Sequence, residues 1–323
     1  MKRDCSTTDS PYFYVSGDKM AKSNLEEVYQ LIVDETEAVL KDNSELSRIE
    51  ALMESLLTLQ IDDGKYEYAD LRKAVQFAYL YQLNEESVQA NHQLTPDSIG
   101  YLIAHLVDLF KEKDHINMLD AGSGTGHLSM TVKEHVDQVS FHGVEVDPVL
   151  SRFNVALCDF LKVPMDIYPH NIIEPAKLKK ADIAVGDLPI GYYPLPVEGF
   201  TTAFKEDKSF AHLLMLEAAM GHVEDDGIGI FVVPSNILEE NNETIKEYIS
   251  TEVTLLMFLN LPDTLFKTEN MHKSIIVLKK GYKPIEDIEV LIGDVPDFKN
   301  AEQMKLFLGR TDAWYDTYTS KKK

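Results

Sequence analysis

Residues Ile116–Gly126 read Ile-Asn-Met-Leu-Asp-Ala-Gly-Ser-Gly-Thr-Gly. The apolar run Ile116–Leu119 predicts a buried strand, and the residues from His127 onward predict a helix. A strand, a glycine-rich turn and a helix make the first unit of a doubly wound α/β sheet, in which ligands bind at the carboxyl ends of the strands. Glycine in the turn adopts positive φ without a steric penalty and lets the backbone approach a ligand. The stretch therefore predicts a ligand-binding α/β domain.

The spacing of the glycines, and the acid before them, bear on the kind of ligand. The dinucleotide fingerprint is G-x-G-x-x-G, whereas this turn reads G-x-G-x-G and starts two residues after Asp120. A carboxylate is unfavourable beside a pyrophosphate but suits S-adenosylmethionine, which carries an amino group and a sulfonium and no phosphate. The pattern D-x-G-x-G-x-G after a strand also resembles motif I of the class I S-adenosylmethionine-dependent methyltransferases, which implies S-adenosylmethionine as the cofactor. The alternative is a structural turn in another α/β protein. The predicted loop consists of Asp120, Ala121, Gly122, Ser123, Gly124 and Gly126.

Composition sets the broad class. The chain has 323 residues, 44% of them hydrophobic, enough for one large domain with an appendage or for two domains. No apolar run approaches the ~20 residues of a membrane-spanning helix, and the N-terminus lacks the apolar region of a signal peptide. The two cysteines, Cys5 and Cys158, argue against a disulfide framework or a cysteine metal site, and Cys158 is expected to be a small buried hydrophobe. We expect a cytoplasmic protein with no membrane partner and no metal.

The charge balance bears on partners. The net charge is −23, from 54 acidic and 31 basic residues, and the only basic cluster is the C-terminal 321–323, interpreted as a solvated tail. Because binding to duplex nucleic acid depends on Lys and Arg displacing counterions, the chain alone is expected to bind nucleic acid weakly.

The N-terminal part lacks the strand pattern seen later. Residues 1–19 are polar and aperiodic and are predicted to be a disordered leader. Residues 20–90 have helical apolar periodicity, with a capping box expected at Asn24 and Glu27, and are predicted to form a small helical domain. This domain is the candidate docking surface for a protein partner.

Residues 91–323 are predicted to form the second domain. Thr95 is expected to cap a helix that spans 98–110, with Pro96 at the first helical position. Thr95 and Pro96 are also expected to cover the predicted cofactor loop. Strands and helices then alternate, which predicts a Rossmann-like sheet of seven strands with right-handed crossovers. A C-terminal extension adds a short β segment at 288–292 and a helix at 301–318. The strands predicted after the first one are 139–146, 164–168, 181–186, 227–233, 253–259 and 274–279, and the main helices between them are 148–161, 209–222 and 239–250.

Two further sites are expected to contact the cofactor. Glu145, with Val146 beside it, closes the second strand, where a carboxylate accepts hydrogen bonds from both ribose hydroxyls. NAD requires the same acid, so Glu145 does not distinguish the two cofactors, and Asp147 is interpreted as the cap of the next helix. Asn171, with Ile172, follows the third strand and is the candidate adenine contact.

The fourth strand ends in Gly-Asp-Leu-Pro-Ile-Gly-Tyr-Tyr-Pro at 186–194. Methyltransferases that act on planar amino nitrogens carry [NDS]-P-P-[YFW] there: the side chain and the next carbonyl accept hydrogen bonds from the target amino group, and the aromatic ring stacks on the flipped base. Asp187 and Pro189 match this pattern, and Leu188 can still supply its carbonyl. Ile190 cannot stack, so Tyr192 or Tyr193 would have to do so from a shifted position. The alternative interpretation is a turn-rich loop.

Together these motifs resemble the adenine-specific N6 DNA methylase family, typified by the M subunits of type I restriction–modification systems, and more narrowly the YtxK-type class I methyltransferases. The resemblance covers 93–280. It includes Gln-Leu-Thr-Pro-Asp at 93–97, the glycine turn, Glu145, the loop from Asp187, and the segments at 226–236 and 261–280. It implies a Rossmann-like domain that binds S-adenosylmethionine.

The resemblance implies methylation of a planar nitrogen, with adenine N6 in DNA or RNA as the leading acceptor. A glutamine amide in a protein, methylated by the same loop chemistry, is the alternative within enzymes. A binding or regulatory module that uses S-adenosylmethionine without catalysis is the alternative outside them. An intact glycine loop together with Asp187 and Pro189 favours catalysis, and a partner docked on the helical domain could supply recognition.

Overall fold

The computed structural model describes residues 23–62, 64–85, 94–204, 208–239, 243–266, 268, 271–283 and 289–321. The predicted leader at 1–19 lies outside the described residues, as does the predicted domain boundary near residue 90.

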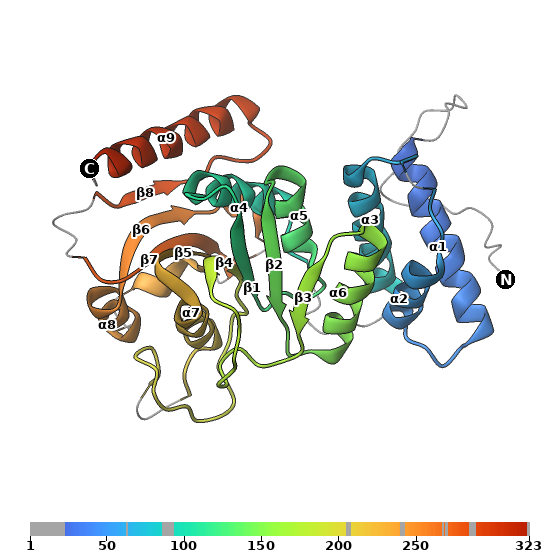
Figure 1. Ribbon diagram of the computed structural model, residues 1–323, viewed down its shortest axis with the longest axis horizontal. Coiled ribbons are helices and arrows are strands. Elements are labelled where there is room, and N and C mark those ends of the chain that lie inside the picture. The colour runs from blue at the N-terminus through green and yellow to red at the C-terminus, as the bar shows by residue number, and fades with distance from the viewer. Residues whose placement is uncertain are drawn as a thin grey trace.

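The strands of the described residues form one sheet at the centre of the molecule, in the order β3-β2-β1-β4-β5-β7-β6-β8 (Figure 1). All strand pairs are parallel except those of β7, which runs antiparallel to β5 and β6. The prediction of seven strands was wrong by one, because the short C-terminal segment pairs with β6 and extends the sheet as β8. The strands are β1 Ile116–Ala121, β2 Val139–Val144, β3 Met165–Tyr168, β4 Ala181–Asp187, β5 Val223–Pro234, β6 Val253–Asn260, β7 Lys273–Lys280 and β8 Leu291–Asp294.

Helices cover both faces of the sheet, and alternate residues of each strand pack against them. On β1, Met118 belongs to one apolar cluster and Leu119 to the other, as expected of side chains that point to opposite faces. Helices α4, α5, α6 and α9 belong to the first cluster, and α7 and α8 to the second. Their bounds are α4 Asp97–Phe110, α5 His127–His135, α6 Pro148–Leu161, α7 Ala211–Gly221, α8 Glu243–Thr251 and α9 Ala301–Ser320. Within the described ranges, no helix has the length and apolar character needed to cross a bilayer.

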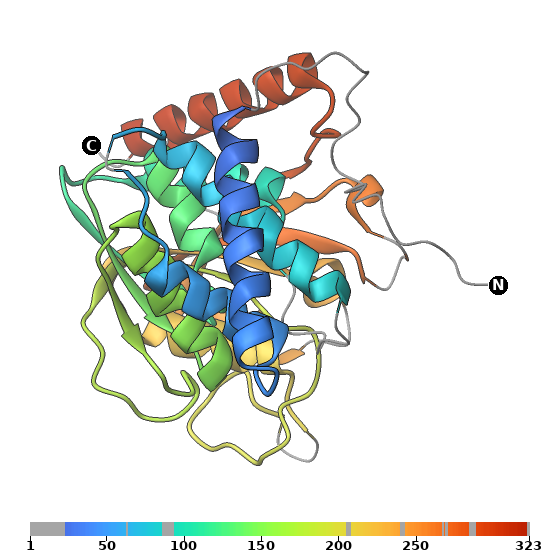
Figure 2. The same ribbon diagram turned by 90° about the vertical axis from the view of Figure 1, so that its right-hand side faces the viewer.

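The N-terminal segment forms α1 Asn24–Asp42, α2 Arg48–Thr58 and α3 Tyr68–Glu85, which lie beside α6 (Figures 1 and 2). Their buried residues join the same apolar cluster as α4, α5 and α6; for example, the rings of Tyr79 and Phe153 meet edge to face at 5.0 Å. The predicted capping box at Asn24 and Glu27 was wrong by one residue. Ser23 is the cap, and its reciprocal partner is Glu26.

A buried ion-pair cluster connects α3 to the sheet domain. Arg72 has no exposed surface, and its guanidinium donates to Asp97 at the start of α4 at 3.1 Å and to Glu134 of α5 at 2.6 Å. Tyr101 accepts from the same guanidinium at 3.1 Å. Because a buried cation without partners is costly, this cluster fixes how α3, α4 and α5 pack. It also holds the first residue of α4, which follows Thr95-Pro96.

Candidate active site

Three carboxyl groups meet where neighbouring strands end. Asp120 lies near the end of β1, Glu145 directly follows β2, and Asp187 is the last residue of β4. Strand β1 pairs with both β2 and β4, so these acids share one edge of the sheet at the point where the strand order reverses. Open α/β sheets bind their ligands at such an edge.

Asp120 is buried beneath this edge. Its Oδ2 accepts a hydrogen bond from the Ser129 hydroxyl of α5 at 2.6 Å. Burial raises the pKa of Asp120 to about 7, although the Ser129 bond lowers it, and the charges of Glu145 and Asp187 raise it further. A nearby positive charge would stabilise the ionised form of this carboxyl, so the position favours a cationic ligand.

The turn after β1 has the backbone that the glycine spacing predicts. Gly124 has φ +51°, and a β-carbon there would meet nothing within 4 Å, so its Cα faces open space. Gly126 has φ +84°, and a β-carbon there would lie 2.3 Å from Oδ1 of Asn154 in α6. Gly124 therefore leaves room for a ligand at the turn, and Gly126 permits α5 and α6 to pack closely.

Glu145 ties the glycine turn to the end of β2. Its Oε2 accepts from the Gly124 amide and its Oε1 from the Asp147 amide, each at 2.8 Å. Burial raises the pKa of Glu145, and these amides oppose the rise. Each oxygen keeps a further lone pair for a hydroxyl donor. Asp147 caps α6 through the amides of Val149 and Leu150, as predicted.

Asp187 accepts hydrogen bonds from two side chains far away in sequence. The Thr95 hydroxyl donates to its Oδ2 at 3.0 Å, and the Lys273 ammonium donates to its Oδ1 at 2.6 Å. The prediction that Thr95 caps α4 was wrong: Pro96 holds the cap position without a side-chain bond. The Thr95 hydroxyl is directed to the end of β4 instead.

Lys273 is a site residue that no sequence pattern predicted. It lies 86 residues after Asp187 and is the first residue of β7. Because β7 runs antiparallel to β5, its start lies at the edge where the parallel strands end. Only the strand order reveals this proximity, since no local motif marks the lysine.

The loop after Asp187 presents an exposed aromatic ring. Leu188 is fully buried, and its amide donates to the Val232 carbonyl of β5 at 3.0 Å. Pro189 is exposed and Ile190 is half exposed. Tyr192 is 60% exposed and stacks on Phe210, with ring centroids 4.8 Å apart and planes 19° apart. The ring of Tyr192 is therefore accessible to a base from solvent.

The candidate adenine contact Asn171 bonds to a residue of the loop that follows β4. Asn171 donates through Nδ2 to the Tyr193 hydroxyl at 2.8 Å, which links the turn after β3 to the loop after β4. Ile172 is buried and packs in the cluster of α7 and α8. Val146 is 66% exposed beside Glu145.

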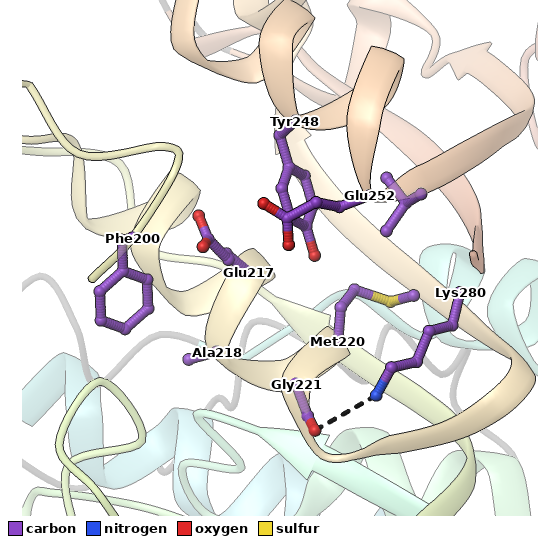
Figure 3. A pocket seen from close by; sticks show the side chains of 9 residues that line it. Phe200, Glu217, Ala218, Met220, Gly221, Tyr248, Glu252 and Lys280 are labelled. Carbon is purple, nitrogen blue, oxygen red and sulfur yellow. Dashed lines mark hydrogen bonds between the residues drawn. The ribbon is translucent and has the colours of Figure 1, made fainter. Parts of the chain in front are cut away.

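A pocket of about 280 Å³ lies beside the start of β6 and the end of β7, at the strand ends opposite to those that carry the three acids. Its lining comes mainly from α7, α8, the start of β6 and the last residue of β7, and includes Glu217, Tyr248 and Lys280 (Figure 3). Glu217 accepts from the Thr201 and Thr202 amides at 2.9 and 2.8 Å. This acid therefore anchors the distal part of the loop that begins at Asp187.

The strand order, the antiparallel β7 and the glycine turn after β1 define a Rossmann-like class I methyltransferase. The chain belongs to the N-6 DNA Methylase family, whose model matches residues 77–323. The predicted family is thus confirmed, as are the fold class and S-adenosylmethionine as the cofactor of this class.

Individual relatives agree with this assignment. The chain is 31% identical over 327 residues to the uncharacterised protein YtxK of Bacillus subtilis, covering 92% of this chain and 99% of YtxK. A candidate class I S-adenosylmethionine-dependent methyltransferase from Listeria monocytogenes is 27% identical with a TM-score of 0.78, over 90% of this chain and 99% of that one. The methyltransferase subunit of a type I restriction–modification system from Streptococcus thermophilus has a TM-score of 0.64 at 17% identity, over 90% of this chain and 70% of that one, a likeness of fold alone.

Proposed function

We propose that this protein transfers a methyl group from S-adenosylmethionine to the N6 amino group of adenine in DNA or RNA. The proposal rests chiefly on the position of Asp187, an acceptor at the end of β4 beside the glycine turn, on the edge that also carries Glu145. Membership of the N-6 DNA Methylase family supports this acceptor.

The residues of the glycine turn suit the cofactor. Asp120 and the open backbone at Gly124 would face its cationic methionine end, with Thr95 and Pro96 covering it. Glu145 would accept from the ribose hydroxyls, and Asn171 with Ile172 would border the adenine. Bound S-adenosylmethionine supplies a methyl group made electrophilic by its sulfonium.

The loop after β4 would orient the acceptor. The Asp187 carboxylate and the Leu188 carbonyl would accept the two amino hydrogens, which turns the nitrogen lone pair out of the ring plane and toward the methyl carbon. S-adenosylmethionine would supply the methyl group and would leave as a neutral thioether, so that the bond formed to nitrogen is balanced by the bond broken at sulfur. Asp187 would stabilise the positive charge that develops on nitrogen, and the methylated nitrogen would release its proton to solvent. Alignment of the two reacting atoms supplies much of the rate.

Tyr192 is proposed as the stacking residue in place of Ile190, because its ring is exposed and backed by Phe210. Stacking on an aromatic ring would offset the few kcal/mol needed to unstack a base. With a net charge of −23, the chain would require a partner for tight binding to nucleic acid, and the acidic helices α1–α3 are the proposed docking surface.

The test is transfer of a tritiated methyl group from S-adenosylmethionine to separate DNA, RNA, protein and small-molecule fractions of a lysate. We expect label in DNA or RNA, recovered after hydrolysis as N6-methyladenine, and none with Asp187→Ala. The control Glu198→Ala changes an exposed acid of the same loop and should keep the activity. Label in protein would favour the glutamine amide instead. Absence of label from every fraction, with cofactor binding confirmed, would leave a binding module.

A further inference from the structure

Lys273 occupies a fixed position beside the proposed acceptor group. Its ammonium lies 2.6 Å from Oδ1 of Asp187, and only 22% of the lysine side chain and 20% of the aspartate side chain are exposed. The lysine backbone is held on two sides, since Lys273 pairs with Pro234 of β5 and its carbonyl accepts from the Leu261 amide at 3.1 Å. The ammonium therefore reaches Asp187 from a rigid strand.

The residue after Lys273 reinforces this position. The Ser274 hydroxyl lies 2.9 Å from the Ser235 hydroxyl and 2.9 Å from Oδ1 of Asn260. Asn260 in turn donates to Asp294 at the end of β8 at 2.9 Å. A polar network that links the residue after β5 with β7, β6 and β8 thus holds the start of β7 in place. Side chains supported in this way keep a functional group in one geometry.

The ion pair also changes the charge that the site presents. Asp187 shares its edge with Asp120 and Glu145, so an unpaired carboxylate at this point would add to a negative field. A polyanionic acceptor would be repelled by that field, and a carboxylate free to rotate would not aim a lone pair at one amino hydrogen. The ammonium on Oδ1 and the Thr95 hydroxyl on Oδ2 together fix the carboxylate plane.

We infer that Lys273 is a positioning residue for methyl transfer: it neutralises Asp187 and holds its carboxylate in the plane in which it accepts from the target amino group. The pair of Asp187 and Lys273 carries no net charge. It therefore offers the target amino group an acceptor oxygen much as a neutral asparagine would. This inference rests on the proposed function of Asp187.

The inference makes a specific prediction about combined variants. Lys273→Met should lower kcat by about a hundredfold, the scale of a group misplaced by ~1 Å, and leave the affinity for S-adenosylmethionine unchanged. Lys273→Arg, which keeps the charge, should restore part of that loss. In an Asp187→Asn background, where no charge needs neutralising, adding Lys273→Met should change kcat by less than about threefold. Lys246→Met, on the exposed face of α8, is the matched control.

The wild type, Lys273→Met, Asp187→Asn and the double variant should also be unfolded with urea in the absence of any acceptor. Coupling between Lys273 and Asp187 in this stability cycle shows that the pair exists in solution, whatever the activity. A positioning role is overturned if Lys273→Met is equally harmful in both backgrounds, if it only raises KM, or if the stability cycle shows no coupling. An inactive wild-type protein that still shows the coupling would instead sink the proposed function, and the role of Lys273 in transfer with it.

Discussion

The hydroxyl of Thr95 donates a hydrogen bond to Oδ2 of Asp187 at 3.0 Å, across 92 residues of sequence. This bond joins the segment before α4 to the last residue of β4. Because Asp97, two residues after Thr95, is paired with the buried Arg72, the bond also links the N-terminal helices to the proposed acceptor site. Displacement of α3 by a partner would therefore change the position of the Asp187 carboxylate.

Thr95→Val should lower methyl transfer about tenfold, because a hydrogen bond to a charged group contributes roughly 1.5–3 kcal/mol. The valine has nearly the volume of threonine, so any fall in the melting temperature should reflect the loss of this one bond. Thr95→Ser retains the hydroxyl and serves as the control. Equal kcat values for the valine and serine variants would show that this bond does not orient Asp187.

Glu145→Ala should weaken binding of S-adenosylmethionine by a few kcal/mol, because charge-assisted hydrogen bonds to the ribose are lost. Calorimetry with S-adenosylmethionine, S-adenosylhomocysteine and NAD measures the effect. The wild-type protein should bind the first two ligands and not NAD, and Glu198→Ala should bind like the wild type. Binding of NAD without a response to S-adenosylhomocysteine would overturn the assignment of these residues to the cofactor.

Asp120→Asn should make the unliganded protein more stable than the wild type at neutral pH. The pKa of Asp120 is raised from its ordinary value near 4 to about 7 in the folded chain, so the folded state holds a proton that the unfolded state releases. Below about pH 4 Asp120 is protonated in both the folded and the unfolded state, so its ionisation does not lower the free energy of unfolding. Between about pH 4 and 7 the wild type loses stability as pH rises, by up to about 1.4 kcal/mol per unit, and above 7 the loss is complete.

Urea unfolding of wild type and Asp120→Asn at about pH 4.5 and 7.5 checks this window. The difference in unfolding free energy should grow with pH, whereas a constant difference would refute the shift. The affinity of the wild type for cationic S-adenosylmethionine should rise through the same window, as the carboxylate forms, and the asparagine variant should bind more weakly without that rise.

Gly126→Ala should destabilise the protein by more than the ~1–2 kcal/mol that left-handed backbone costs an alanine, because its β-carbon would also clash with Asn154 at 2.3 Å. Gly64→Ala separates the two effects, since Gly64 has φ +78° and nothing within 4 Å of a β-carbon. The melting temperature should fall further for the variant at 126. Equal losses would mean that Asn154 moves aside freely.

The local part of this fold follows from the sequence. The apolar run before Asp120 and the alternate glycines predict the strand and its turn, because burial and positive φ are properties of single residues and their neighbours. Cys158 is buried as predicted, and the predicted helix at 148–161 coincides with α6. The predicted helix caps were less accurate: Asn24 was predicted to cap α1, and Ser23 does so in the structure. Adjacent polar residues compete for the same amide groups, so the sequence does not fix which one is the cap.

The pairings around Asp187 were decided only by tertiary structure. The sequence marks Thr95 as a helix cap and does not mark Lys273 at all, yet both side chains bond to the same carboxylate. Strand β8 likewise exists because β6 offers it an edge. Glycine spacing and apolar periodicity act over a few residues, so they can be read along the chain. Which strand lies beside which, and therefore which distant side chain meets a carboxylate, is set by packing of the whole sheet.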